Sequence, residues 1–281
     1  MRANAKNTIF ATVAAWPDWK EKTHVIRRSA ERYGIDLLLV GAGDSWKNYY
    51  ENKIVALREW LMRYRTARPE VHYLVFVDAR DAVFVKQRDE IIELLEDFDE
   101  EKVTFNTDRR MVTWTVRAHW FAQRISLKYG MDGIANSGLY AGRIDRVLEM
   151  YDQCIALKRF FNSKEQRPGT VEGVLKQAIR DDGGPFTIAR YARSEQHFES
   201  DQFYIQLLQA QWSDLIAVDI ERRVFAGFSD GWPTLANWQS NGTMPLGTAG
   251  ILHSPWMFHR EKMTPENVAA WEDWARRERI I

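Results

Sequence analysis

The alternation of apolar runs with amphipathic stretches between residues 9 and 106 most constrains what this chain can fold into. Four apolar runs have the length of strands: residues 9–15, 35–40, 73–77 and 102–106. The stretches between them repeat apolar side chains at helical spacing, as at Tyr50, Leu57 and Tyr64. This βαβαβαβ order predicts an α/β fold with a doubly wound sheet.

The predicted sheet also indicates where a ligand would bind. In open α/β sheets, ligands lie beyond the carboxyl ends of the strands. The expected strand ends here are Val77/Asp78, Asn106 and the loop after Val40. We therefore expect any active site at that edge of the sheet.

Length and composition are those of a globular protein with a proper core. The chain has 281 residues, of which 45% are hydrophobic and 28% charged. We expect a single domain, residues 1–281, with an insertion at about 158–196 that contains two turn-rich segments. The 39 basic and 39 acidic residues balance, so no net field draws in polyanions and indiscriminate nucleic-acid binding is not expected.

The cysteine content and the first residues of the chain bear on its cellular location. Cys154 is the only cysteine, so no internal disulfide can form. The apolar run at residues 8–16 contains two threonines and leads into an amphipathic stretch, which favours a first strand over an export signal. No stretch reaches the roughly 20 apolar residues that a membrane span needs. These features predict a reducing, cytoplasmic location.

The segment with the most chemical content follows the third apolar run. Asp78 and Asp81 stand three residues apart where the run at 73–77 ends. Two carboxylates so placed can offer oxygen ligands to one divalent cation, which could bridge two phosphates and neutralise a departing diphosphate. The alternative is a plain turn in which Arg80 makes a surface salt bridge.

Several segments, in order, resemble the glycosyltransferase domain of the procollagen lysyl hydroxylases. Phe-Val-Asp78-Ala-Arg-Asp81-Ala-Val is similar to the metal motif of that family. The other similar segments are Arg28-Ser-Ala30, Gly43-Asp-Ser-Trp46 with Lys53, Asn136-Ser-Gly-Leu-Tyr-Ala-Gly142, Ser200-Asp201-Gln202-Phe-Tyr204, Val218-Asp219 to Phe225, and Gly250-Ile-Leu-His253. Segments in the same order from about residue 25 to 253 are far more specific than any one of them.

The resemblance implies a glycosyltransferase-A fold, a Rossmann-like three-layer α/β sandwich with a mixed central sheet. Its first half would bind the nucleotide and its second half the acceptor. The chain departs from the family in a longer insertion between Asn136 and Asp201, in a reduced acidic run before Gln202, and in Ser254-Pro255 after the histidine. These departures concern the acceptor and the sugar more than the metal and the nucleotide.

The family's metal ligands carry over to Asp78, Asp81 and His253. A histidine nitrogen beside two carboxylates favours Mn²⁺, with Mg²⁺ as the other candidate. A single histidine on a late strand is more often structural, and this alternative stands beside the ligand assignment.

The nucleotide of a UDP-sugar donor would meet residues from the first half of the chain. The resemblance places Trp46 against the base, Thr12 near the uridine or ribose, and Lys53 near the diphosphate. Arg80 stands where the family has a residue against the ribose, and Asp78 would reach the phosphates through the metal. The alternatives are an exposed loop aromatic for Trp46 and a solvated helix lysine for Lys53.

Four further residues would surround the sugar and the reaction centre. Asn136 would contact the donor sugar, and Asp201 would lie near the reacting atoms. Asp108 and Trp114 resemble the acidic residue and the tryptophan of a flap over the sugar. The structural alternatives are a turn residue for Asn136, a helix-terminal aspartate for Asp201, and an exposed turn for Asp108 and Trp114.

The resemblance implies transfer of a hexose and suggests a hydroxylysine-linked sugar on a collagen-like protein as the acceptor. A hydroxyl on another protein, a glycan or a hydroxymethylated DNA base stays open as an alternative acceptor, and the protein could be a homo-oligomer. Two other functions compete with it. A phosphatase-like hydrolase also ends a strand in aspartate, but it needs a second aspartate two residues on, where this chain has Arg80. A catalytically silent binding module of the same fold would recruit a partner instead.

Overall fold

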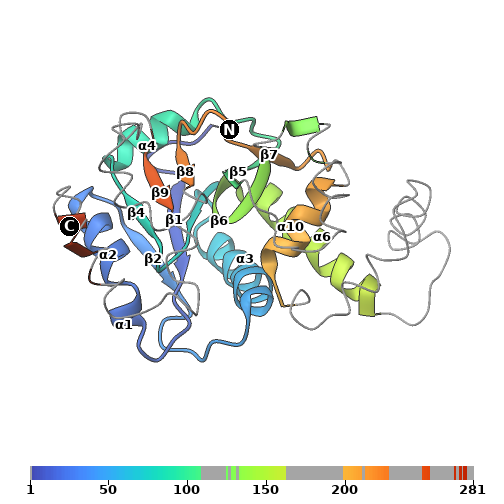
Figure 1. The fold of residues 1–281 in the computed structure, drawn as a ribbon, viewed down its shortest axis with the longest axis horizontal. Helices are drawn as coiled ribbons and strands as arrows, with labels where there is room; N and C mark the ends of the chain where they lie inside the picture. The colour runs from blue at the N-terminus through green and yellow to red at the C-terminus, as the bar shows by residue number, and fades with distance from the viewer. Residues whose placement is uncertain are drawn as a thin grey trace.

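A six-stranded sheet forms the centre of the computed structural model (Figure 1). The strand order is β2-β1-β3-β6-β5-β7. The structure describes residues 2–108, 125, 128–130, 133–162, 199–210, 213–227, 249–253, 269, 272–273 and 275–276. Most of the predicted insertion at 158–196 lies outside these residues.

The sheet is mixed, as expected from the resemblance. Its strands are β1 (Thr8–Val13), β2 (Leu37–Val40), β3 (Tyr73–Val77), β5 (Val103–Asp108), β6 (Ile134–Arg143) and β7 (Ile216–Val218). The first three run parallel, and β5 is parallel to β7. The long β6 runs antiparallel between β3 and β5. All four apolar runs of the sequence are therefore strands of one sheet.

Helices cover both faces of the sheet, which makes the fold a three-layer sandwich (Figure 1). On one face lie α2 (His24–Arg32) and α4 (Arg88–Leu95), with the short α1 (Trp19–Lys22) beside α2. On the other lie α3 (Leu57–Ala67), α6 (Ile144–Asn162) and α10 (Asp201–Ala210). Every residue of β3 is buried, as is typical of a strand covered on both faces.

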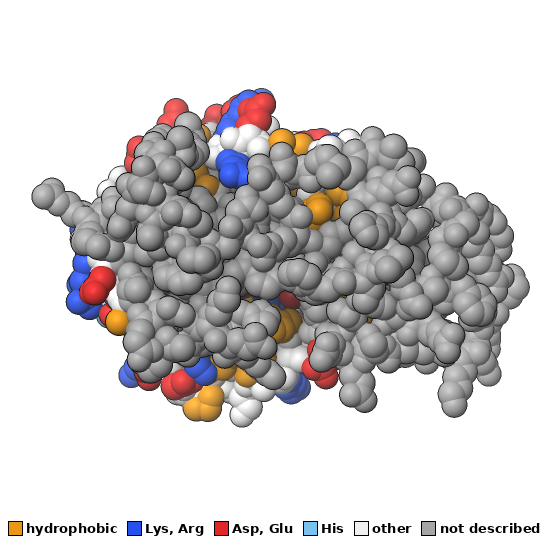
Figure 2. Space-filling model, in the orientation of Figure 1, with side chains coloured by type: hydrophobic (Ala, Val, Ile, Leu, Met, Phe, Trp, Pro, Cys, Tyr) orange, Lys and Arg blue, Asp and Glu red, His pale blue; other side chains and the backbone are white. Residues whose placement is uncertain are grey.

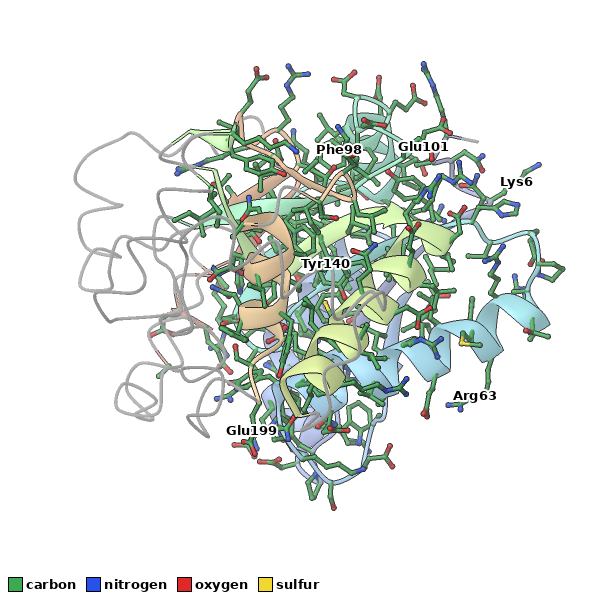
Figure 3. All side chains as sticks on the ribbon, turned by 90° about the vertical axis from the view of Figure 1, so that its right-hand side faces the viewer. Lys6, Arg63, Phe98, Glu101, Tyr140 and Glu199 are labelled. Carbon is green, nitrogen blue, oxygen red and sulfur yellow. The ribbon has the colours of Figure 1, made fainter. Side chains whose placement is uncertain are left out.

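Tyr140 of β6 lies in the interior beneath the helices (Figure 3). Its ring stacks on Phe76 with centroids 4.7 Å apart, and its hydroxyl is hydrogen-bonded to that of Tyr151 on α6. Burial raises the pKa of the Tyr140 hydroxyl well above its usual value. The tyrosine pair therefore stays neutral and ties the sheet to α6.

A second sheet brings the late part of the chain to the end of β3. It has the order β4-β9-β8, from β4 (Ala82–Phe84), β9 (Ile251–His253) and β8 (Phe225–Gly227). β4 pairs antiparallel with β9, and Ala82 stands opposite His253. This register sets His253 beside Asp81, the residue that precedes β4.

A break in register interrupts the pairing of β5 with β6. Phe105 stands opposite Tyr140, but the next residue, Asn106, stands opposite Asn136, so residues 137–139 bulge out. The Asn136 Oδ1 accepts the backbone N–H of Gly138 at 2.8 Å, which stabilises the bulge. Bulges re-aim side chains, often next to active sites.

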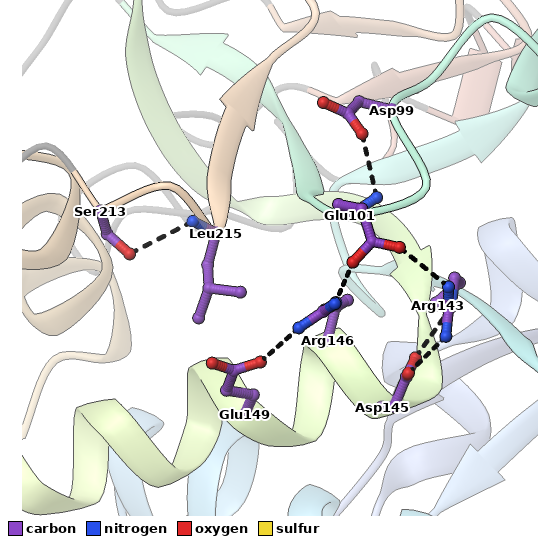
Figure 4. Close-up of polar contacts among 8 residues, drawn as sticks. All are labelled: Asp99, Glu101, Arg143, Asp145, Arg146, Glu149, Ser213 and Leu215. Carbon is purple, nitrogen blue, oxygen red and sulfur yellow. Dashed lines mark hydrogen bonds and ion pairs between the residues drawn. The ribbon is translucent and has the colours of Figure 1, made fainter.

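The outer surface mixes both signs of charge. Figure 2 shows Lys, Arg, Asp and Glu side chains interspersed around the described part of one face. Figure 4 shows one network, in which Glu101 binds Arg143 and Arg146, and these bind Asp145 and Glu149. This network links the start of β5 to α6. Among the described residues, no helix is long and apolar enough to cross a membrane.

Asp219 fixes the turn that leads into β8, and its replacement should destabilise the fold. Its buried carboxylate accepts backbone N–H groups of Arg223, Val224 and Phe225 at 2.8–3.0 Å. We expect Asp219→Ala to lower the free energy of unfolding by about 2–4 kcal/mol, because buried donors lose their partners. Urea denaturation measures the change. Asp214→Ala, at an exposed aspartate before β7, is the control and should be nearly neutral.

Candidate active site

Two aspartates leave the central sheet at the end of β3. The backbone N–H of Asp78 donates to the Gly138 carbonyl at 2.8 Å, which continues the pairing of β3 with β6. Asp81 is buried immediately before β4, and Asp78 is partly exposed. The strand ends, and not the helices, therefore set the positions of both carboxylates.

His253 meets both aspartates from β9. Its Nε2 lies 3.5 Å from Asp78 Oδ2 and 3.5 Å from Asp81 Oδ1. The ring is buried, and Nε2 makes no hydrogen bond of normal geometry. Burial alone would lower the pKa of His253, but the charges of Asp81 and Asp78 outweigh it and raise the pKa to about 9. One ligand atom from each residue lies within 4.8 Å of the others, so the three could hold one metal ion.

Gly138 makes room for the histidine ring. A Cβ at this position would lie 2.0 Å from Cε1 and 2.3 Å from Nε2 of His253. Real Cβ atoms essentially never approach so closely, so any side chain here would displace the ring. The glycine of the Asn136-Ser-Gly138 segment is therefore explained by its contact with His253.

Lys53 joins Asp78 to a third aspartate. Its ammonium lies 2.7 Å from Asp78 Oδ1 and 3.2 Å from Asp201 Oδ2, and it is buried. Burial by itself would lower the pKa of Lys53, but the charges of Asp201 and Asp78 outweigh it and raise the pKa. The lysine stands on the π-helix η1 (Glu51–Ala56), a rare form of helix that is frequent at functional sites. Lys53 is thus not a solvated helix lysine.

Asp201 is the first residue of α10 and is buried. Helix capping does not account for its position, because the Ser200 Oγ accepts the N–H of Phe203 at 3.4 Å. The Asp201 carboxylate instead faces the ammonium of Lys53. The side chain is therefore directed toward Asp78 and the metal-binding candidates.

An aromatic pocket adjoins the aspartates. Its lining includes Trp16, Trp46, Tyr49, Lys53, Asp78, Arg80 and Asp81. The Trp16 and Trp46 rings stack with centroids 4.8 Å apart and an interplanar angle of 11°. Tyr49 meets Trp46 edge-on at 5.2 Å, and the Arg80 guanidinium lies 6.0 Å from the Trp16 ring. The pocket therefore combines aromatic rings with charged side chains.

The remaining predicted site residues lie apart from this pocket or beyond the described residues. Thr12 is fully buried, and its neighbour Val13 lines the pocket. Asn136 is buried in the bulge and is not part of the lining. Asp108 ends β5, whereas Trp114 lies outside the described residues. Their roles in donor binding stay predictions.

Sequence reasoning missed two of the residues that shape the site. Trp16 follows the apolar run at residues 9–15 directly, so the rule on strand ends points to it, but only Trp46 was predicted to stack on the base. Gly138 lies in the Asn136–Gly142 segment of the resemblance, but its contact with His253 joins distant parts of the chain and no local pattern predicts it. The rule on strand ends placed Asn106 at the same edge of the sheet, but the sequence assigned it no function.

Comparison with known proteins identifies the family of the chain. The family model described as the PLOD GT domain, the glycosyltransferase domain of procollagen lysyl hydroxylases, matches residues 4–158. The match defines the chain as a glycosyltransferase-domain protein with the GT-A-like sandwich described above. Because more than half of the chain is matched, the protein belongs to the PLOD GT domain family.

Other comparisons are more distant. No curated protein matches the chain. One similar solved structure is the crystal structure of a glycosyltransferase involved in the glycosylation of the major capsid of PBCV-1. It is 10% identical, with a TM-score of 0.45, and the match covers 94% of this chain and 99% of that one.

The buried ion pairs of Lys53 make a testable contribution to stability. We expect Lys53→Met to lower the free energy of unfolding by about 3–5 kcal/mol, because it leaves two carboxylates without their buried partner. Adding Asp201→Asn to Lys53→Met should recover part of the loss, since the two residues interact directly. Lys102→Met, at a surface ion pair with Asp99, should cost about 1 kcal/mol or less. Additive losses for Lys53 and Asp201 in urea unfolding would contradict the pairing.

Proposed function

We propose that this protein is a metal-dependent glycosyltransferase that moves a hexose from a UDP-sugar to a hydroxyl acceptor. The observation that carries the proposal is the convergence of Asp78, Asp81 and His253 next to an aromatic pocket. Family membership supports glycosyl transfer as the class of reaction.

The three side chains suit a divalent cation such as Mn²⁺ or Mg²⁺. His253 Nε2 is buried and lies 3.5 Å from an oxygen of each carboxylate, so a divalent cation would take over the charge compensation that a proton on the ring supplies without it. An imidazole nitrogen with two carboxylate oxygens favours Mn²⁺ over Mg²⁺. When bound, the cation would neutralise charge on the diphosphate leaving group.

The pocket gives the donor a direction. A uracil base would pack against the tryptophans, and the diphosphate would lie near Asp78 and Asp81. Trp46 already stacks on Trp16, so one of its faces is covered in the free protein. The base would stack on the pair or displace one ring, and Arg80 would lie close to the ribose.

The transfer breaks the bond between the anomeric carbon and the diphosphate oxygen and forms a bond from that carbon to the acceptor oxygen, while the acceptor hydroxyl gives its proton to the departing diphosphate or to water. Positive charge develops on the sugar as the diphosphate leaves. The Asp201 carboxylate, on the far side of Lys53 from Asp78, would stabilise this charge or position the acceptor hydroxyl. Lys53 would hold Asp201 at a set position relative to Asp78. The acceptor hydroxyl could belong to a protein, a glycan or a modified DNA base.

The decisive test is a panel of nucleotide-sugars assayed with Mn²⁺ for release of the nucleoside diphosphate. Water often replaces an unknown acceptor in such assays. We expect a UDP-sugar to be cleaved only with a divalent cation, with Mn²⁺ best. Asp81→Asn should lower the rate about 10-fold or more, and the exposed control Asp89→Asn should not. Full activity in excess chelator would contradict the metal requirement.

The same assay separates the competing functions. A catalytically silent module would bind UDP-sugars in calorimetry but release no product with any of them. A phosphatase-like hydrolase would cleave simple phosphate esters without preference for a nucleotide-sugar. Arg80, which lies where such an enzyme needs its second aspartate, weighs against the hydrolase.

Asp201 provides an independent prediction about catalysis. We expect Asp201→Asn to lower kcat by roughly 100-fold while UDP affinity, measured by calorimetry, changes little. The reason is that the lost charge acts on the sugar and the acceptor and not on the nucleotide. Gln202→Glu, at the next residue of α10, is the control for a changed charge nearby. An unchanged rate in folded Asp201→Asn would leave only a structural role for this aspartate.

A further inference from the structure

We propose that Asn106 is a positioning residue that orients the His253 ring and directs its Nε2 toward Asp78 and Asp81. The inference rests on the proposed function, since it assumes that these three residues hold a divalent cation. Asn106 stands on β5 of the six-stranded sheet, whereas His253 stands on β9 of the second sheet.

The first step is the position of the Asn106 amide. Asn106 is completely buried, and one of its amide atoms lies 3.4 Å from His253 Nδ1. We assign the amide nitrogen to the opposite side, where it donates to the carbonyls of Asn136 at 2.8 Å and Leu139 at 3.1 Å. The amide oxygen then faces Nδ1, so it accepts the Nδ1–H of His253.

The second step is the rigidity of this amide. Both carbonyls that hold it belong to the bulged part of β6, which the bond from Gly138 N–H to Asn136 Oδ1 stabilises. Within the bulge, the Gly138 carbonyl accepts the N–H of Asp78. The bulge therefore connects Asn106 to the backbone of Asp78. The amide oxygen of Asn106 contacts the other ligand candidate, His253.

The third step is the chemistry of the ring. A histidine that donates Nδ1–H carries its free lone pair on Nε2 once that nitrogen has lost its proton. Nε2 is the nitrogen that faces the two carboxylates, and it makes no hydrogen bond. On the third side, Gly138 leaves the space that Cε1 occupies, which any Cβ would fill. Partners of this kind typically contribute about 10- to 100-fold to metal affinity.

The experiment compares three variants of Asn106 for Mn²⁺ binding by calorimetry. Asn106→Ala and Asn106→Leu both remove the oxygen, and the leucine keeps most of the volume in case the alanine variant does not fold. Asn106→Asp keeps an oxygen toward Nδ1 but loses both donors to the bulge. Thr104→Val, at a buried threonine on the same strand, is the control. A second readout is the Nδ1–H resonance of His253 in metal-free protein by NMR, assigned with His253→Gln.

We expect Asn106→Ala and Asn106→Leu to bind Mn²⁺ about 10- to 100-fold more weakly and to lose the protected Nδ1–H resonance. Asn106→Asp and Thr104→Val should keep both. Equal loss in Asn106→Asp and Asn106→Ala would overturn the proposal, because the amide would then support only the bulge. If wild-type protein binds Mn²⁺ and all variants bind it equally well, the proposal for Asn106 is wrong, but the proposed metal site is not contradicted. Absence of Mn²⁺ binding by wild-type protein overturns this inference together with the proposed metal site.

Discussion

The pairing of β4 with β9 is the constraint on which the site depends. β4 follows Asp81 directly, and β9 ends at His253, so their antiparallel register sets an imidazole beside two carboxylates. β8 adds a third strand, and the Asp219 carboxylate fixes the turn that leads into it. Stability of this small sheet and geometry of the candidate metal site are therefore linked.

Charge balance forms a second level of organisation. Three carboxylates, those of Asp78, Asp81 and Asp201, gather at one edge of the sheet, and only Lys53 and His253 contact them among the ion pairs of the described residues. Buried like charges repel, so each needs a compensating partner. Lys53 meets this need for Asp78 and Asp201 at once. The proposed cation at Asp78, Asp81 and His253 would complete the balance.

Irregular backbone occurs where the functional side chains lie. η1 is a π-helix, and it presents Lys53 inward toward the aspartates. The break in β5–β6 pairing sets Asn136 and Gly138 between Asn106, Asp78 and His253. Regular elements would have placed these side chains differently, since one extra residue re-aims all that follow. The hydrophobic core of the sheet and the surrounding helices stabilises the fold despite these irregularities.

The sequence by itself determined four strands of the central sheet, the helical stretches between them and the position of Asp78 at a strand end, because apolar periodicity and strand-end chemistry are local properties. Ordered similarity to a known family also pointed to the mixed sheet and to the residues Asp81, Asp201 and His253. Only the tertiary structure decided that Lys53 is buried between two aspartates, that Trp16 covers one face of Trp46, and that Asn106 meets the histidine ring. These contacts depend on pairings between strands and helices far apart in the chain, and on a bulge that shifts register by several residues. Periodicity tells which face of an element is apolar, but it does not tell which distant side chain will lie opposite.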